Sequence, residues 1–370
     1  MRLAFPDEVL KKAEEIVEDV KRRGVEAALE WSRRLDGAAP EEPLVEPRAA
    51  EFDADVVEAA LAAARSLERA YKRLLPPDVV DYYEGVLRVI RWTPVEKAAL
   101  YVPARYISTL VMTAVPAKIA GVEKIYVVTP PKGLTPELLA LAERLGVSGV
   151  VPIGGAQGLA YAAFALGVDI LAGPGGAYVQ AAKYLLSRYV GIDGIEGPTE
   201  LAVYAEGVDA EVAVRGALAQ LEHGPTSFAV LLSRDGGLLE RALEIYRAKR
   251  TSSMGPLEVR RVSSLQEAAE AINSLAPEHV EVWGAPSLTP LIKNAGAVSV
   301  DAPSPLLDYI AGISHVLPTG GSARWRGALT PLAFLKPLGL AQELSRSPLR
   351  RYAEALARYE GFKFHEEALR

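Results

Sequence analysis

Apolar residues recur at helical spacing in the first part of the chain. The segment from Asp7 to Arg23 is predicted to form an amphipathic helix, because one face collects the apolar residues Leu10, Ala13, Ile16, Val17 and Val20. Gly24 ends this helix, and further helices are predicted over 25–35 and over 54–75, where two prolines close the pattern. These helices carry no metal-binding or catalytic signal, so we expect this region to serve as scaffold and dimer surface.

From Ala98 onward, short apolar strands alternate with helices, which is typical of parallel βαβ units. Strands are predicted at 98–102, 124–129, 149–153, 169–172 and 200–204, and later at 228–232, 258–262, 279–283 and 298–301. The helix predicted over 108–121 is expected to be capped by Ser108 or Thr109, and a later helix by Ser264 with Glu267. A final helix is predicted at 349–360. The alternation predicts a Rossmann-like sheet.

Composition excludes several kinds of site and partner. The chain has 370 residues, a net charge of -6 and no cysteine. Without cysteine there are no disulfides, no cysteine–zinc sites and no thiol catalysis, and we expect a cytoplasmic protein. No broad basic field is present for nucleic acid or an anionic membrane. Acidic residues appear within residues 1–8, too early for a signal peptide. No uncharged apolar run reaches the ~18 residues of a membrane span.

The stretch from Gln220 to Pro225 holds the first candidate site. A helix is predicted over 209–221, and Gly224-Pro225 ends it. Gln220 and His223 are three residues apart, so their side chains point the same way from the last helical turn. An amide oxygen and an imidazole on one face could bind a metal such as zinc. The simpler alternative is a helix end whose polar side chains face solvent.

Two glycine-rich turns, at 154–157 and 173–176, connect a predicted strand to a helix. Free N–H groups at the start of a helix suit a phosphate. Neither turn is a G-x-G-x-x-G motif, and no acidic residue follows at the spacing that would contact a ribose. Tight strand-to-helix turns need glycine with or without a ligand, so a nucleotide site and a structural turn both stay open.

The chain has only four histidines, at positions 223, 279, 315 and 365. Glu278 and His279 stand where a helix gives way to a strand, at a sheet edge, and α/β enzymes place chemistry at such edges. Asp308 and His315 are too far apart for one helical face and would meet only through a loop. Taken singly, Asp308, His315 and His365 could be a cap and two surface histidines.

Together these residues suggest a site. Gln220, His223, Asp308 and His365 are a plausible ligand set for Zn²⁺ or a similar divalent ion. Glu278 beside His279 offers a base and a carboxylate to tune it.

These motifs give the chain a resemblance to the histidinol dehydrogenase family. The segments 20–29, 110–122, 154–157 and 173–175 are similar to the family, and the most specific matches are Glu222-His223-Gly224-Pro225, Ala276-Pro277-Glu278-His279 and His315-Val316-Leu317-Pro318-Thr319. The resemblance covers nearly the whole chain, and all four histidines fall on family motifs. It implies oxidation of L-histidinol through L-histidinal to L-histidine with two NAD⁺, the last step of histidine biosynthesis.

The resemblance also implies residue roles. The zinc ligands would be Gln220, His223, Asp308 and His365, and the acid–base pair would be Glu278 and His279. The substrate would contact Thr199, Gln220, His223, His279, Asp308, His315, Glu360 and His365. NAD would contact Tyr101, Gln157 and Gly176. In the family the C-terminal tail crosses to the partner, so Glu360 and His365 would complete the neighbour's site in an obligate homodimer.

The expected fold class is α/β, with two incomplete Rossmann-like domains of parallel sheets flanked by helices, N-terminal helices and a C-terminal helical tail exchanged between subunits. Residues 1–25 are expected to form the N-terminal helical segment. Residues 26–100 with 200–330 would form the first Rossmann-like domain, which carries the metal and acid–base residues. Residues 101–199 would form the second, on the cofactor side, and 331–370 the dimerisation tail.

Three loops differ from the family pattern. Ala104-Arg105 stands where the family usually has Gly-Gly, Gly176 replaces an NAD-contacting Asn, and no Glu is evident before Asp308. These changes bear on NAD affinity. They leave two alternatives to a dehydrogenase: a non-catalytic paralogue that binds a metal or an amino acid, and a metal-dependent hydrolase on the same scaffold. The intact Glu278–His279 pair argues against the first, and Gln157 with both glycine turns argues against the second.

Overall fold

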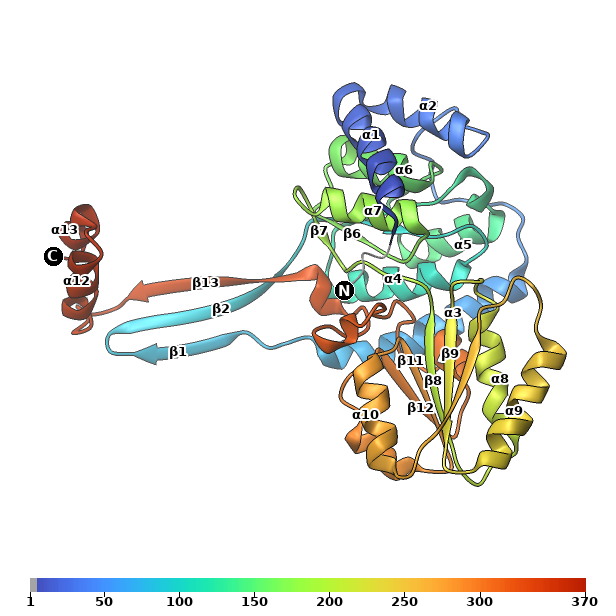
Figure 1. The fold of residues 1–370 in the computed structure, drawn as a ribbon. Coiled ribbons are helices and arrows are strands. Elements are labelled where there is room, and N and C mark those ends of the chain that lie inside the picture. Colours follow the sequence, from blue (N-terminus) through green and yellow to red (C-terminus); the bar gives the residue numbers. More distant parts are fainter. Residues whose placement is uncertain (1–4) are drawn as a thin grey trace. The chain divides into compact units, whose positions relative to one another are not determined.

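The computed structural model describes residues 5–370. Residues 1–4, which begin the expected 1–25 segment and the acidic N-terminus, lie outside the described residues. The chain divides into two compact units (Figure 1). Unit 1 consists of Met1–Leu74 and Val95–Phe334, and unit 2 consists of Leu75–Pro94 and Leu335–Arg370.

The first sheet of unit 1 is five-stranded and parallel, in the order β5-β4-β3-β6-β7. Its strands are β3 (Lys97–Tyr101), β4 (Lys124–Val128), β5 (Gly149–Val151), β6 (Ile170–Ala172) and β7 (Gly191–Ile192). The helices between them are α4 (Ile107–Ala120), α5 (Pro136–Leu145), α6 (Gly155–Tyr161) and α7 (Ala177–Leu186). Helices cover both faces of a parallel sheet, and the central strands are accordingly apolar along most of their length.

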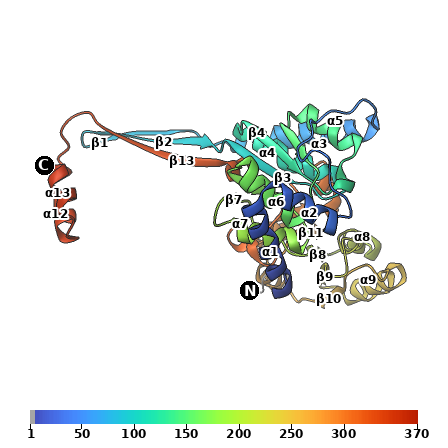
Figure 2. The ribbon, with the colours of Figure 1, turned by 90° about the horizontal axis from the view of Figure 1, so that it is seen from above.

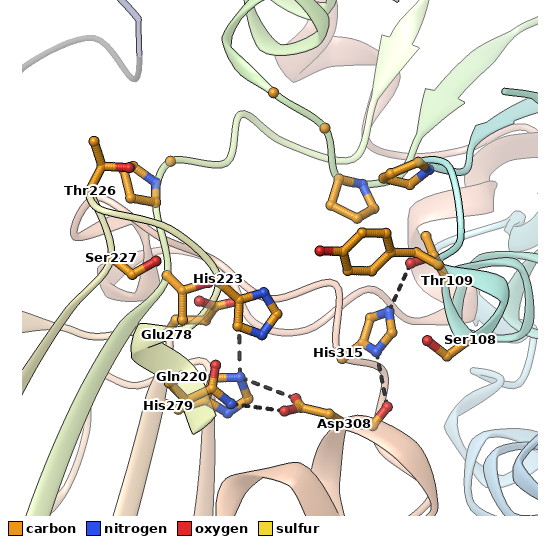
Figure 3. Close-up of a pocket in the computed structure, with 18 of the residues that line it drawn as sticks. Ser108, Thr109, Gln220, His223, Thr226, Ser227, Glu278, His279, Asp308 and His315 are labelled. Carbon is orange, nitrogen blue, oxygen red and sulfur yellow. Dashed lines mark hydrogen bonds and ion pairs between the residues drawn. The ribbon is translucent and has the colours of Figure 1, made fainter. Parts of the chain in front are cut away.

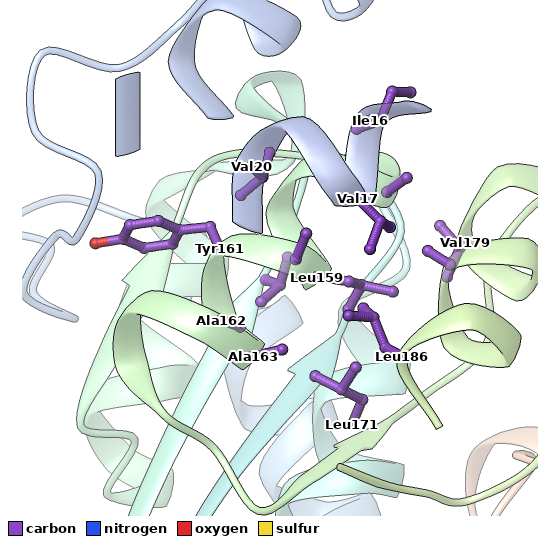
Figure 4. Close-up of a cluster of buried hydrophobic side chains, with 14 of the residues drawn as sticks. Ile16, Val17, Val20, Leu159, Tyr161, Ala162, Ala163, Leu171, Val179 and Leu186 are labelled. Carbon is purple, nitrogen blue, oxygen red and sulfur yellow. The ribbon is translucent and has the colours of Figure 1, made fainter. Parts of the chain in front are cut away.

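The N-terminal helices α1 (Asp7–Arg23) and α2 (Val25–Leu35) pack on α6 and α7. Figure 4 shows Val17 and Val20 of α1 facing the apolar side chains of these helices, and Ile16 belongs to the same buried cluster. The helix α3 (Ala54–Tyr71) packs instead against α4 and α5, which Figure 2 shows on the opposite side of the strands. The apolar helix faces predicted from the sequence are therefore the faces that pack in this core.

The second sheet of unit 1 is also five-stranded and parallel, in the order β10-β9-β8-β11-β12. Its strands are β8 (Glu200–Ala205), β9 (Phe228–Ser233), β10 (Leu257–Arg261), β11 (His279–Trp283) and β12 (Ala297–Val300). Helices α8 (Ala210–Leu221) and α9 (Gly236–Lys249) cover one face, and α10 (Leu265–Leu275) covers the other. The short helix α11 (Ser304–Tyr309) follows β12.

Unit 2 contains a three-stranded antiparallel sheet in the order β1-β2-β13. Its elements are β1 (Val79–Tyr83), β2 (Val86–Pro94), β13 (Leu335–Glu343), α12 (Arg350–Tyr359) and α13 (Lys363–Leu369). Most side chains of the three strands are exposed on both faces. Among residues 5–370, no helix combines the length and apolar character that a membrane span requires.

The expected fold class, α/β with parallel sheets flanked by helices, is confirmed. The clustering of contacts keeps both parallel sheets in one unit, so the division into domains of 26–100 with 200–330 and of 101–199 stays a prediction. The contacts of α2 and α3 nevertheless run to helices within 101–199, and 75–94 groups with the tail. These groupings differ from the expected boundaries because helices pack by apolar face and not by sequence order.

One predicted helix cap is wrong and one is confirmed. The helix α4 begins at Ile107 after Tyr106, with no side-chain cap from Ser108 or Thr109. The Thr109 side chain is buried and its hydroxyl bonds to His315 instead. At α10, the Ser264 hydroxyl accepts a hydrogen bond from the backbone N–H of Glu267 at 3.2 Å, as predicted.

Candidate active site

A pocket of about 350 Å³ opens between the two parallel sheets of unit 1. One wall comes from loops that follow the carboxyl ends of β3 and β6, including Pro103, Tyr106 and the turn 174–176. The other comes from the amino ends of β8 and β11, where Thr199, Glu278 and His279 lie. In the second sheet the pocket therefore lies at the amino ends of the strands, whereas α/β sheets usually bind ligands at the carboxyl ends. Gln220, His223, Asp308 and His315 complete the lining.

The Asp308 carboxylate lies at the centre of the hydrogen bonds in this pocket (Figure 3). Its Oδ1 lies 3.2 Å from His279 Nε2, and its Oδ2 accepts a hydrogen bond from Gln220 Nε2 at 2.8 Å. Burial by itself would raise the pKa of Asp308, but the hydrogen bond and the charge of His279 outweigh burial and lower the pKa below its usual value. Asp308 is therefore a carboxylate at neutral pH.

His279 is almost fully buried, and the carboxyl groups of Glu278 and Asp308 lie near its Nε2 atom. Burial opposes its charged form, yet the hydrogen bond to Asp308 and the charges of Glu278 and Asp308 raise the pKa of His279 above its ordinary value. Its Nδ1 is buried and has no hydrogen-bond partner among the described residues. An imidazole with a raised pKa is a stronger base than free imidazole.

Glu278 lies beside His279, with Oε1 4.0 Å from His279 Nε2. Burial raises the pKa of Glu278 to about 7, the charge of His279 lowers it and the charge of Asp308 raises it. The backbone N–H of Glu200 donates to Glu278 Oε2 at 3.4 Å. A carboxyl with a pKa near neutrality can both take and return a proton at physiological pH.

His315 meets Asp308 through the loop after α11, as the spacing predicted. His315 Nδ1 lies 2.9 Å from the backbone carbonyl oxygen of Asp308, and Nε2 lies 3.2 Å from Thr109 Oγ1. A carbonyl only accepts, so Nδ1–H donates to it, and Nε2 of the neutral ring accepts from the Thr109 hydroxyl. Burial lowers the pKa of His315 although Asp308 opposes this, which fits a neutral ring.

The three expected NAD contacts lie in different places. Gly176 lines the pocket, in the turn that precedes α7. Tyr101 and Gln157 are buried behind the other glycine turn. The Tyr101 hydroxyl accepts from the backbone N–H of Gly155 at 3.2 Å, and Gln157 Nε2 donates to Asp36 Oδ2 at 3.0 Å. Both side chains therefore support the turn 154–157.

The remaining candidates belong to unit 2. Glu360 follows the last residue of α12, and His365 lies in α13. The pocket lining described above comes from unit 1 alone. Within residues 5–370, no three His, Cys, Asp or Glu side chains cluster closely enough to hold a metal ion. The expected ligand set includes an amide, which is outside those four residue types.

Several pocket residues were not predicted from the sequence. They are Pro103, Tyr106, Ser108, Thr109, Pro174, Gly175, Gly197, Pro198, Thr226, Ser227 and Tyr309. Most are small or lie in turns, and only a neighbouring motif marks their position. Thr226 and Ser227 directly follow Gly224-Pro225, and Tyr309 directly follows Asp308, so adjacency to a motif was the one available signal.

Comparison with known proteins agrees with this fold. The sequence model of the histidinol dehydrogenase family matches residues 4–370. A histidinol dehydrogenase of Pyrobaculum aerophilum is 64% identical over 366 residues, which cover 99% of both chains. One from Saccharolobus solfataricus is 39% identical and covers 98% of this chain and 95% of its own.

Solved structures show the same fold. Histidinol dehydrogenase from Elizabethkingia anophelis superposes with a TM-score of 0.90 at 24% identity, covering 98% of this chain and 92% of that chain. An indole-3-acetaldehyde dehydrogenase gives a TM-score of 0.52 at 16% identity.

The fold and the pocket between two Rossmann-like sheets define an α/β protein with a candidate acid–base site. The match over 4–370 and the 64% identity make the assignment specific: the chain belongs to the histidinol dehydrogenase family. The function expected from the sequence, histidinol dehydrogenase, is thereby confirmed at the level of the family.

Proposed function

We propose that this chain oxidises L-histidinol through L-histidinal to L-histidine, with two NAD⁺ as hydride acceptors and zinc as the anchor of the substrate. The observation that supports this most is the convergence of five side chains on one pocket in a chain of this family: Gln220, His223, Glu278, His279 and Asp308.

The donor atoms in the pocket suit a zinc ion. Gln220, His223 and Asp308 offer an amide, an imidazole and a carboxylate in the pocket lining, and Gln220 Nε2 lies 2.8 Å from Asp308 Oδ2. His365 of the partner subunit would supply the fourth ligand. Bound zinc would act as a template that holds the imidazole and amine of histidinol.

His279 is the proposed base of the first oxidation. Its imidazole would take the hydroxyl proton of histidinol, and bound NAD⁺ would accept the hydride from the same carbon, which would give the aldehyde. The raised pKa of His279 favours this transfer because Asp308 and Glu278 stabilise the imidazolium that forms. The neutral His315 and Thr199 line the same pocket, which supports the proposal that both contact the substrate.

Glu278 is the proposed base of the second stage. The aldehyde must add water before a second hydride can leave, and the Glu278 carboxylate takes a proton from that water. With a pKa of about 7, Glu278 is ionised in a large fraction of molecules at neutral pH and can pass the proton on. A second NAD⁺ would accept the hydride of the hydrated aldehyde, which would give the carboxylate of histidine.

NAD is proposed to bind at the carboxyl ends of the first sheet. Both glycine turns lie there, after β5 and β6, and α/β sheets bind nucleotides at such ends. Gly176 reaches the pocket itself. The Tyr101 hydroxyl and the Gln157 amide keep the turn 154–157 in place, so they would support the coenzyme through that turn.

A homodimer with shared sites is proposed from unit 2. Unit 2 exposes large apolar side chains, including Tyr359 (91% exposed), Phe364 (80%) and Leu356 (62%). Such a surface is typical of an interface, and the same region holds Glu360, directly after α12, and His365, in α13. A second copy of the chain would cover these side chains and receive both residues. A cytoplasmic location, and the absence of a nucleic-acid or membrane partner, stay predictions.

The first test is NADH formation by zinc-loaded protein with L-histidinol and NAD⁺. We expect two NADH per histidinol, and a His279→Ala variant that loses at least ~10²-fold in rate, since a positioned base contributes about that much. Absence of NADH from wild-type protein that still binds zinc and histidinol would overturn the proposal in favour of a non-catalytic paralogue.

A further inference from the structure

The side-chain amide of Gln220 is held by two residues of α11. Gln220 Nε2 lies 3.1 Å from Ser304 Oγ and 2.8 Å from Asp308 Oδ2. A carboxylate can only accept, so the NH₂ group and not the amide oxygen must face Asp308. Both amide hydrogens are then engaged, one by each partner. The amide oxygen is left as the polar atom of Gln220 that is available to a ligand in the pocket.

Ser304 is itself fixed by a buried carboxylate of the second sheet. Its backbone N–H donates to Glu281 Oε1 at 2.6 Å, and Glu281 Oε2 accepts from the indole N–H of Trp283 at 3.0 Å. Ser304 and Glu281 are both 0% exposed. Neither lines the pocket. Ser304 therefore connects Glu281 of β11 to the Gln220 amide of α8, and Ser304 itself does not line the pocket.

We propose that Ser304, anchored by Glu281, is a positioning residue that presents the Gln220 amide oxygen to a divalent cation. The inference rests on the proposed zinc site. An amide oxygen can coordinate a cation and an NH₂ group cannot. Removing the Ser304 hydroxyl frees one amide hydrogen, so the amide can rotate and spend part of its time with the NH₂ group toward the cation.

The test is the zinc affinity of the full-length Ser304→Ala variant, measured by competition with a chromophoric chelator. We expect the dissociation constant to rise about 10-fold, since groups that orient a ligand usually change metal affinity by about 10–100-fold and Asp308 still holds one amide hydrogen. Co²⁺-loaded protein should show an altered visible absorption spectrum, because the donor set around the cation changes.

The matched control is Ser299→Ala, which removes another buried serine hydroxyl from the same sheet region. Ser299 Oγ bonds only to the Val280 carbonyl oxygen, at 3.4 Å, among the described residues. Its zinc affinity should stay within about twofold of wild type. Thermal unfolding of each metal-free variant checks that the fold is intact, and Ser304→Gly, which also lacks the hydroxyl, replaces Ser304→Ala if that variant does not fold.

A Gln220→Ala variant separates this inference from the proposed function. If Gln220→Ala binds zinc as tightly as wild type, the proposed metal site is wrong whatever Ser304 does. If Gln220→Ala loses affinity while both Ser304 variants bind like wild type, the zinc site stands and the positioning role of Ser304 is refuted. Weakened binding in both Gln220→Ala and the Ser304 variants supports both.

Discussion

The pKa values of acidic side chains in this pocket depend strongly on their neighbours and on burial. Asp308 is kept ionised by His279, while Glu278, one residue from His279, is pushed toward neutrality by burial. Two carboxyl groups of one pocket thus differ in pKa, which suits a ligand role for one and a proton-transfer role for the other. The different roles proposed for Asp308 and Glu278 follow from this difference in pKa.

Glu200 should make stability depend on pH. Its Oε1 accepts from the backbone N–H of Gly320 at 3.1 Å, its Oε2 is buried without a hydrogen-bond partner among the described residues, and burial raises the pKa of Glu200 to about 7. Between about pH 4.5 and 7 the folded protein then holds a proton that the unfolded chain releases, so the Glu200 contribution to stability is lost as pH rises.

A Glu200→Gln variant should therefore gain stability relative to wild type between pH 5 and pH 8. The expected gain is about 1–3 kcal/mol, since one pKa unit corresponds to about 1.4 kcal/mol. Guanidinium unfolding at both pH values measures it, with the exposed Glu240→Gln as control. An equal difference between wild type and Glu200→Gln at the two pH values would contradict the assignment.

At the scale of elements, a buried ion cluster joins α7 to two loops that line the pocket. Lys183 of α7 is fully buried; its Nζ lies 2.6 Å from Asp193 Oδ1, 2.7 Å from Glu196 Oε2 and 3.1 Å from the Gly173 carbonyl oxygen. The turn at Gly173 leads to Gly176, and Glu196 directly precedes Gly197 of the lining. One ammonium group therefore ties both loops to a helix.

Lys183→Met should lower the free energy of unfolding by about 3–5 kcal/mol. The methionine matches lysine in length but leaves the buried Asp193 without its cation, while Glu196 keeps its ion pair with Arg326. Breaking a buried ion pair costs about this much. Chemical denaturation measures it. Arg188→Met, which removes a cation 56% exposed just beyond the same helix, should cost less than about 1 kcal/mol. Similar losses in the two variants would show that the cluster is not structurally important.

At the scale of the whole molecule, the proposed site needs two chains. Unit 1 supplies the pocket. Unit 2 carries Glu360 directly after α12 and His365 in α13, and both helices have few buried residues. If the tail serves the partner, each site in a dimer combines unit 1 of one chain with unit 2 of the other.

Mixing two inactive variants tests this arrangement. Neither His365→Ala nor His279→Ala should be active alone, but a mixed dimer would hold one site with both residues intact. After subunits exchange, about half of the molecules are mixed, so roughly a quarter of wild-type activity should return, as sharing of sites in a symmetric dimer requires. Exchange without any return of activity would show that each chain completes its own site.

The sequence by itself determined the elements whose signals are local. The helices over 7–23 and 25–35 occur as predicted because an apolar stripe at helical spacing depends only on neighbouring residues. The motifs around His223, Glu278 and His315 likewise marked the pocket, since each is a short run whose position needs no knowledge of the fold. The strands β1 and β13 were not predicted, because neither shows the regular alternation of apolar and polar residues that marks a half-buried strand.

Only the tertiary structure decided which side chains from distant parts of the chain contact one another. It brought Thr109 to His315, Ser304 to Gln220 and Lys183 to Asp193, pairs that the chain separates by 206, 84 and about 10 residues. It placed the pocket at the carboxyl ends of one sheet and the amino ends of the other. Hydrogen bonds and pKa values depend on distance and burial in space, and a sequence pattern does not contain these quantities.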